Sequence, residues 1–362
     1  MKEPLRLNIM DLNRDNCNVL RGISILLIAL HNFCHQISFA VKENEYLFKK
    51  QNYDAFINSI INFDLYEFPI NFFSFFGHYG VPIFLYLTGY GLIIKYGTYN
   101  NKRLTFIKYE YLKLLRLMLP GFLLFLGIFL YRKHYLPLSL KEIGAQILMI
   151  TNVFHGLNFR IKPGPYWYFG LTFQLYLLYI IIINTKGNNR TRITIKILSL
   201  ILICYIVQAI CIPDSKAIVN LRYNFFHAML PFGIGILSGL FTFEKCTLNN
   251  KQLLVLLFML AIIILLFSSN FYLWLLLPVF VISFIFICTH LIKNTLLHRI
   301  FSFLGIYSAI IFVTHPIARE LVFWKFKDAE TYQQLFLYII ITALMTIVFQ
   351  WGYKFIPKPR TI

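Results

Sequence analysis

The stretch from Leu20 to Gln36 reads LRGISILLIALHNFCHQ, an apolar run that carries one arginine and two histidines. A run of this length and composition is typical of a helix that enters a lipid bilayer. With a helical rise of about 1.5 Å per residue, His31 would lie about 15 Å and His35 about 21 Å along the axis from Arg21. Residues four apart share a helix face, so we expect both histidines on one side of the helix.

Ionisable side chains inside a membrane span are costly, and they indicate function by default. The competing interpretation is a snorkelling Arg21 with two packing histidines, because buried polar groups usually just find a partner. A pair of histidines on one face, together with an arginine, supports a functional site at least as well as this structural interpretation.

The composition of the whole chain is that of a membrane protein. Of its 362 residues, 58% are hydrophobic and only 14% are charged, whereas a soluble domain is about half apolar and about a quarter charged. Apolar runs of about 20 residues recur along the sequence. We therefore expect a single integral membrane domain over residues 1–362, with no separate soluble domain and no cleavable signal peptide.

The apolar runs predict an all-α fold, a bundle of ten transmembrane helices. The predicted spans are 18–40, 72–96, 112–131, 166–184, 194–211, 223–243, 252–268, 271–291, 301–323 and 334–354. The apolar run 142–154 is too short to cross a bilayer, and we expect it to be interfacial or re-entrant.

The basic residues predict the orientation of these spans, because cytoplasmic loops carry an excess of lysine and arginine. With the N-terminus inside, most basic residues fall in inside segments. Most acidic residues fall outside, among them Glu43, Glu45, Asp54, Asp64 and Glu67 in the first external loop. We therefore expect a multi-pass protein of the cytoplasmic (inner) membrane with both termini cytoplasmic, Arg21 at the cytoplasmic face, and His31 and His35 toward the exterior.

The net charge and the cysteines exclude other classes of protein. The net charge of +19 would suit a nucleic-acid partner, but the basic residues lie between apolar runs rather than on one face, so we expect none. The six cysteines are scattered without a CxxC or paired pattern. They indicate neither a metal site nor a disulfide framework.

Four further motifs follow the first one along the chain. They read GHYGVPIFLYLTGYGL at 77–92, KYEYLKLLRLMLP at 108–120, KPGPYWYFGLTFQLY at 162–176 and LGIYSAIIFVTHP at 304–316. Each alone also fits a structural role: small residues for close helix packing, lysine and arginine as a positive-inside anchor, and aromatic residues as an interfacial belt.

Taken together and in this order, the five motifs resemble those of the membrane acyltransferase-3 family, integral membrane O-acyltransferases that modify sugars and other acceptors. The chain departs from the family pattern in a few places. Arg21 and His31 are ten residues apart where eleven is usual, Thr88-Gly89 replaces Ser-Gly, and Leu119 is an extra residue before Pro120. Thr172 and Phe173 stand where many relatives carry glutamate.

The resemblance implies transfer of an acyl group, expected to be acetyl, from cytoplasmic acyl-CoA to a hydroxyl of a glycan or glycolipid at the outer face of the bilayer. We expect no metal. Histidine suits proton removal from that hydroxyl, because its ordinary pKa lies near neutrality. His31 or His35 would be the general base or a transient acyl carrier. The candidates for binding the phosphates of the donor are Arg21, Lys113 and Arg116. The candidates for binding the substrate are Tyr166, Trp167, Gln174, Tyr307 and His315.

Two alternatives stay open on the sequence alone. A transporter or exporter of a polar anion would line its path with the same charges, but transporters often show internal repeats, and none is found here. A purely structural membrane subunit would leave the two histidines of the first span unexplained.

Overall fold

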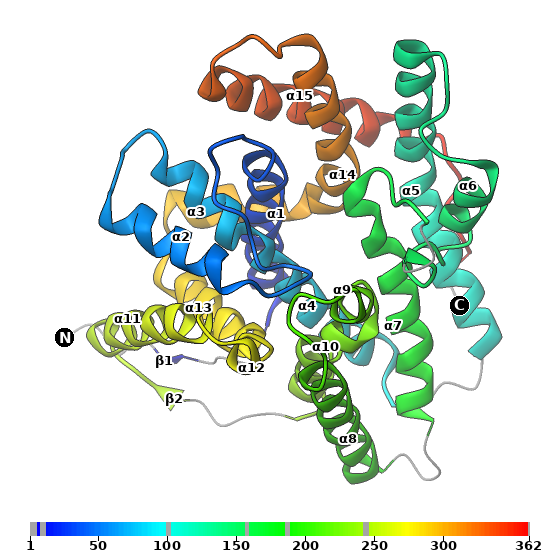
Figure 1. Ribbon diagram of the computed structural model, residues 1–362. Helices are drawn as coiled ribbons and strands as arrows, with labels where there is room; N and C mark the ends of the chain where they lie inside the picture. The colour runs from blue at the N-terminus through cyan, green and yellow to red at the C-terminus, as the bar shows by residue number, and fades with distance from the viewer. Residues whose placement is uncertain are drawn as a thin grey trace. The chain divides into compact units, whose positions relative to one another are not determined.

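A computed structural model describes residues 6–7, 12–98, 103–155, 159–184, 189–241 and 246–360. Helices make up 77% of the structure (Figure 1), which confirms the all-α prediction. In chain order the helices are α1 (Arg14–Cys34), α2 (Lys50–Ile61), α3 (Phe68–Phe76), η1 (Gly77–Tyr79), α4 (Gly80–Tyr96), α5 (Arg103–Lys133), α6 (Leu140–Ile147), η3 (Gly164–Tyr166), α7 (Trp167–Ile183), α8 (Arg190–Ala209), α9 (Lys216–Arg222), α10 (Phe225–Leu240), α11 (Asn250–Phe267), α12 (Phe271–Trp274), α13 (Leu277–Leu291), α14 (Leu296–Lys325) and α15 (Thr331–Gly352). Two short strands, β1 (Arg6–Leu7) and β2 (Cys246–Thr247), pair antiparallel.

The chain forms two compact units, each assembled from separate parts of the sequence. The first contains Met1–Tyr99, Ile182–Ile218 and Phe226–Ile306. The second contains Asn100–Ile181, Val219–Phe225 and Tyr307–Ile362. His31 and His35 therefore belong to the first unit, and the later motifs around Arg116, Trp167 and His315 belong to the second.

Eight of the ten predicted spans correspond to helices that are long and apolar enough to cross a membrane, within the part of the chain that the structure describes. The other two are shorter than predicted. Span 223–243 corresponds to α10, which has 16 residues, and span 271–291 is divided between α12 and the 15-residue α13. Pro278 near the start of α13 explains the division, because proline favours the first helical turn and disfavours helix just before it.

The first predicted span is also shorter than its apolar pattern, since α1 ends at Cys34 and His35 is its C-cap. After His35 the chain turns, and Gln36 and Ile37 donate backbone hydrogen bonds to the carbonyls of Phe33 and Cys34 at 3.1 and 3.0 Å. Polar side chains at 35, 36 and 38 favour this exit from the helix, because they are poorly suited to a continued apolar face. His35 therefore lies at the helix end rather than within a span reaching residue 40.

Within the first unit, α1 packs against α3, η1, α4 and α13. Its contact with the start of α14 is so close that both helices need glycine there. A Cβ on Gly22 would overlap the backbone carbonyl of Phe301, and a Cβ on Gly305 would overlap that of Asn18. Glycine lets helix backbones approach in this way, which gives the glycines of the first and last motifs a packing role.

Alanine at Gly22 or Gly305 should therefore destabilise the protein by about 1–3 kcal/mol, the usual cost of overpacking a filled core. Gly91 is the matched control, because a Cβ there would meet no atom within 4 Å. Gly91→Ala should be neutral or slightly stabilising through helix propensity. The measurement is the temperature at which detergent-solubilised protein loses its monodisperse peak. Equal temperatures for Gly22→Ala and Gly91→Ala would contradict the close packing.

Candidate active site

His31 lies in the last turn of α1, with its imidazole held in one orientation. The residue is 2% exposed, and its Nδ1 lies 3.0 Å from the carbonyl oxygen of Ser74 and 3.4 Å from that of Phe73. A carbonyl oxygen only accepts hydrogen bonds, so Nδ1 carries the hydrogen and Nε2 carries the lone pair of the neutral ring. The fold therefore presents Nε2 of His31 as a proton acceptor.

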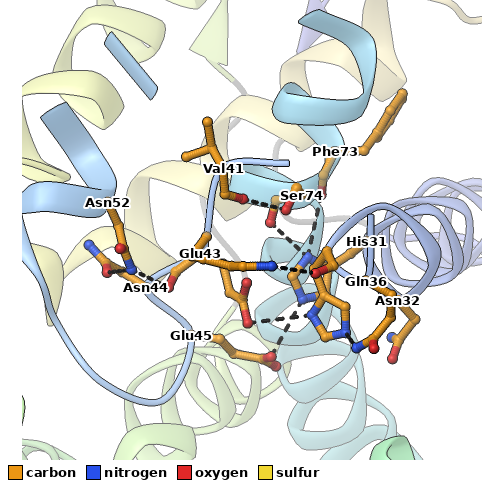
Figure 2. Close-up of polar contacts among 12 residues, drawn as sticks. His31, Asn32, Gln36, Val41, Glu43, Asn44, Glu45, Asn52, Phe73 and Ser74 are labelled. Carbon is orange, nitrogen blue, oxygen red and sulfur yellow. Dashed lines mark hydrogen bonds and ion pairs between the residues drawn. The ribbon is translucent and has the colours of Figure 1, made fainter. Parts of the chain in front are cut away.

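Nε2 of His31 makes no hydrogen bond within the described structure. It lies 3.6 Å from Oε2 of Glu45, a distance that is too long for a hydrogen bond but short enough for an ion pair when the ring is protonated. The carboxylate would favour the imidazolium that forms when His31 takes a proton. Figure 2 shows the side chains of Glu43 and Glu45 on one side of His31 and the Ser74 backbone on the other.

His35 lies beside His31, with ring centroids 4.8 Å apart. Its Nδ1 is 3.4 Å from Oε1 of Glu43, and its Nε2 is 2.5 Å from Nε2 of Gln36. With the Gln36 amide donating to Nε2, the hydrogen of the neutral ring is on Nδ1 and faces Glu43. The structure thus confirms that the two histidines share one side of the helix end, and it gives them different proton arrangements.

Burial alone would raise the pKa of Glu43, but the hydrogen bond with His35 and the charges of His31 and His35 outweigh it and lower the pKa to about 2. Glu43 therefore stays ionised through the pH range in which histidines normally titrate. It is a fixed negative charge next to both rings.

Asn44 positions the two glutamates that flank it. It is 2% exposed, and its side chain exchanges two hydrogen bonds of 3.1 Å with the backbone of Lys49. Asn52 donates to the carbonyl of Glu43 at 2.9 Å and to the Asn44 side chain at 3.0 Å, and the indole of Trp274 donates to the carbonyl of Asn44 at 2.9 Å. Figure 2 shows Asn44 and Asn52 close together to the left of Glu43, on the side away from His31.

The other end of this loop is attached to α3. The N–H of Val41 donates to the side-chain oxygen of Asn71 at 3.0 Å, and the hydroxyl of Ser74 donates to the Val41 carbonyl at 2.5 Å. Because the Ser74 carbonyl also holds His31, one turn of α3 fixes both the base and the loop that carries the glutamates.

The second motif packs directly against α1. A Cβ on Gly77 would lie 2.7 Å from the Cβ of His31 and from the carbonyl oxygen of Leu27, which is closer than side chains approach. His78 follows, with its ring centroid 5.5 Å from that of His31 and a 4% exposed side chain. The glycine thus lets the motif approach His31, and it brings a third histidine to the cluster.

The predicted donor ligands lie in both units. Arg21 in α1 donates to the side chain of Asn18 at 3.3 Å. Lys113 and Arg116 lie one turn apart in α5, as predicted, but each already has a protein partner. Lys113 pairs with the buried carboxylate of Glu110 at 2.9 Å, and Arg116 donates to the carbonyls of Tyr353 and Ile356 at 2.5 and 3.1 Å. Their phosphate-binding role stays a prediction.

Arg116 also lines a pocket of about 540 Å³ in the second unit. Two further cations, Lys354 and Lys358, line it together with Tyr353 and Gln350, and no carboxylate of the described residues does. Arg116 shapes this pocket by holding the chain at 353–356, and Tyr353 adds a hydrogen bond from its hydroxyl to the carbonyl of Leu117 at 2.5 Å. The pocket has the charge that an anionic ligand requires.

Of the predicted substrate-binding residues, Tyr166 and Gln174 are engaged in the packing of the second unit. The buried Tyr166 hydroxyl donates to the carbonyl of Val313 at 3.0 Å. The Gln174 amide donates to Asn224 at 2.7 Å and accepts from the N–H of Phe225 at 3.1 Å. Trp167 is buried and meets the ring of Tyr223 edge to face. Their contact with a substrate stays a prediction.

Tyr307 and His315 both lie in α14, which continues through Pro316. His315 is fully buried, and its Nδ1 donates to the carbonyl of Ile311 at 3.0 Å. Tyr307 is partly buried on the same helix. Because the hydroxyl of Tyr166 donates to the carbonyl of Val313, two residues before His315, the structure brings η3, which directly precedes α7, and the His-Pro motif together in the second unit.

Sequence reasoning placed Glu43 and Glu45 only in an acidic external loop and gave His78 no role. A usable signal existed, since two carboxylates separated by one residue follow His35 within ten positions. Such a pair can return to the end of the helix through a short loop.

A comparison with protein families places these features in a known group. The sequence model of acyltransferase family 3, described as an acyltransferase domain, matches residues 14–353. No curated protein and no solved structure matched the chain. The family match covers all five motifs and both structural units, and the chain therefore belongs to the acyltransferase-3 family of membrane acyltransferases.

Proposed function

We propose that the protein transfers an acyl group, which we expect to be acetyl, from acyl-CoA to a hydroxyl of a glycan or glycolipid, with His31 as the general base. Family membership supports acyl transfer in general. The observation that carries the residue assignment is the buried Nε2 of His31, which has a lone pair, no hydrogen bond and a carboxylate at 3.6 Å.

In this reaction the acceptor hydroxyl gives its proton to Nε2 of His31 as its oxygen attacks the thioester carbonyl. The carbon–sulfur bond then breaks, the CoA thiolate leaves, and the proton on His31 passes to the thiolate to complete the products, an ester and CoA. General-base help of this kind contributes typically about 10²–10⁴-fold to a rate. The Ser74 carbonyl keeps the ring in the reactive tautomer, and Glu45 stabilises the imidazolium.

His35 has a supporting role in this account. Its two ring nitrogens already face Glu43 and Gln36, so it offers no uncommitted lone pair in this arrangement. With a ring 4.8 Å from that of His31, it is placed to orient the base or the acceptor hydroxyl.

The basic pocket supports the choice of donor. Acyl-CoA carries several phosphate charges, and among the described residues the pocket of Arg116, Lys354 and Lys358 is lined by three cations and no carboxylate. The lysines are exposed and sit on a segment that Arg116 holds by two hydrogen bonds. We propose that this pocket binds the phosphates of acyl-CoA from the cytoplasm.

Removal of the base should reduce acyl transfer far more than removal of its neighbour. His31→Ala and His31→Gln should each lower the rate at least about 10²-fold, while His35→Ala should lose clearly less. His290→Ala, in α13 of the same unit, is the matched control. Transfer is measured with radiolabelled acyl-CoA in membranes at equal expression. A larger loss in His35→Ala than in His31→Ala would mean that His35 is the base. Near-full transfer by the variant that carries both His31→Ala and His35→Ala would show that neither histidine takes part in catalysis.

Neutralising the pocket lysines should weaken donor binding without loosening the fold. Lys354→Gln and Lys358→Gln should each raise the Kd for acyl-CoA by about 3–10-fold, in the range of one charge-assisted contact, and the affinity should fall as salt rises. Lys327→Gln, an exposed lysine of the same unit, should bind normally. Calorimetry on purified protein reports the Kd directly. Unchanged binding in both pocket variants would place the donor site elsewhere.

A further inference from the structure

We propose that His31, His35 and Glu43 form a binding site for a divalent transition-metal ion of the zinc type, and that the bound ion reversibly inhibits acyl transfer. The inhibition rests on the proposed function, because it requires His31 to be the base. The binding does not, since it depends only on the geometry of the three side chains.

The three residues gather their ligand atoms at one place. One nitrogen from each histidine and one oxygen of Glu43 all lie within 4.8 Å of one another. The pair of His35 Nδ1 and Glu43 Oε1, at 3.4 Å, already has the separation of two ligands on a tetrahedral ion, since bonds of about 2.0–2.1 Å place the ligand atoms about 3.3 Å apart. Small side-chain rotations complete the remaining approach.

His31 has the environment of a metal-binding histidine. Metal ligands of this type usually donate their second ring N–H to a carbonyl or carboxylate, which fixes the tautomer and aims the other nitrogen at the ion. The Nδ1 of His31 does this with the Ser74 carbonyl at 3.0 Å, and its Nε2 is buried without a hydrogen bond. This buried, unsatisfied nitrogen aimed at the carboxylates is independent evidence for a ligand.

The types of ligand atom at this site indicate which class of metal ion it would bind. Two imidazole nitrogens and one carboxylate suit zinc and neighbouring transition metals, whereas calcium and magnesium require mostly oxygen ligands. Glu45, at 3.6 Å from Nε2 of His31, is within reach as a fourth ligand. The two glutamates would also balance the charge of a divalent ion.

Binding requires one local change. His35 must release the hydrogen that its Nδ1 shares with Glu43 and carry it on Nε2 instead. The Gln36 amide, 2.5 Å from that nitrogen, then turns its oxygen to accept it. No backbone movement is needed, because the loop carrying Glu43 is already fixed through Asn44 and Asn52.

The ion would bind to the lone pair of Nε2 of His31, which accepts the proton in the proposed reaction. A metal on Nε2 of His31 prevents that atom from taking the acceptor proton, so zinc should inhibit, and a chelator should restore the activity. The same reasoning predicts that magnesium and calcium have little effect at concentrations where zinc inhibits fully.

The test is calorimetric titration of chelator-treated, purified protein with ZnCl₂, followed by acyl-transfer assays over the same concentrations. We expect one zinc ion per chain, with an affinity reduced at least tenfold in Glu43→Gln and in His35→Ala. Glu67→Gln, the same change at an exposed position of the first unit, should bind as the parent protein does. Thermal stability of each variant, measured without zinc, separates loss of a ligand from loss of the fold.

The two claims fail in distinguishable ways. If zinc does not bind, or binds equally to the parent, Glu43→Gln and His35→Ala, the metal site is wrong, while the acyltransferase assignment stands on its own assays. If one zinc binds at this site and transfer is unaffected, the inhibition is wrong and His31 is not the base. Binding with reversible inhibition, both weakened in the two variants, supports the proposal.

Discussion

The hydrogen bond between Nδ1 of His31 and the carbonyl of Ser74 is the interaction on which the candidate site depends. It fixes the tautomer, and so it decides that Nε2 is the atom with the lone pair. It also links α1 to α3, whose Ser74 hydroxyl and Asn71 side chain hold the start of the following loop. The same helix, α3, therefore orients His31 and holds the start of the loop that carries Glu43 and Glu45.

A buried imidazole next to two carboxylates is costly unless the polar groups are satisfied. The fold meets this requirement with a set of uncharged contacts around the loop. Asn44 and Asn52 bind the loop backbone, and the indole of Trp274 donates to the carbonyl of Asn44. Among the described residues around the loop, Nε2 of His31 is buried and makes no hydrogen bond. An unsatisfied group that is surrounded by so many satisfied ones is best explained by a reacting proton or a bound ligand.

The sequence predicted the parts of this site that depend on local spacing. Helix formation and the common side of His31 and His35 follow from apolar periodicity and a separation of four residues. The position of Glu43 and Glu45 could not be predicted, because it depends on contacts between Asn44 and Trp274, which are 230 residues apart. The end of α1 at Cys34 was also missed, since the apolar pattern continues beyond it while the polar side chains end the helix. For the cations that were expected to bind the acyl donor, the sequence spacing predicted that Lys113 and Arg116 share a helix face, but it did not predict their protein partners.

The central claim is that His31 is the base and that Glu45 stabilises its protonated form, and a double-mutant cycle tests it most directly. Acyl-transfer rates are measured for His31→Gln, Glu45→Gln and the double variant. If Glu45 works by stabilising the protonated His31, its substitution should reduce the rate in the parent and have almost no further effect once His31 is replaced. The account predicts this strong non-additivity. Equal fold-losses from Glu45→Gln in the presence and absence of His31 would contradict it.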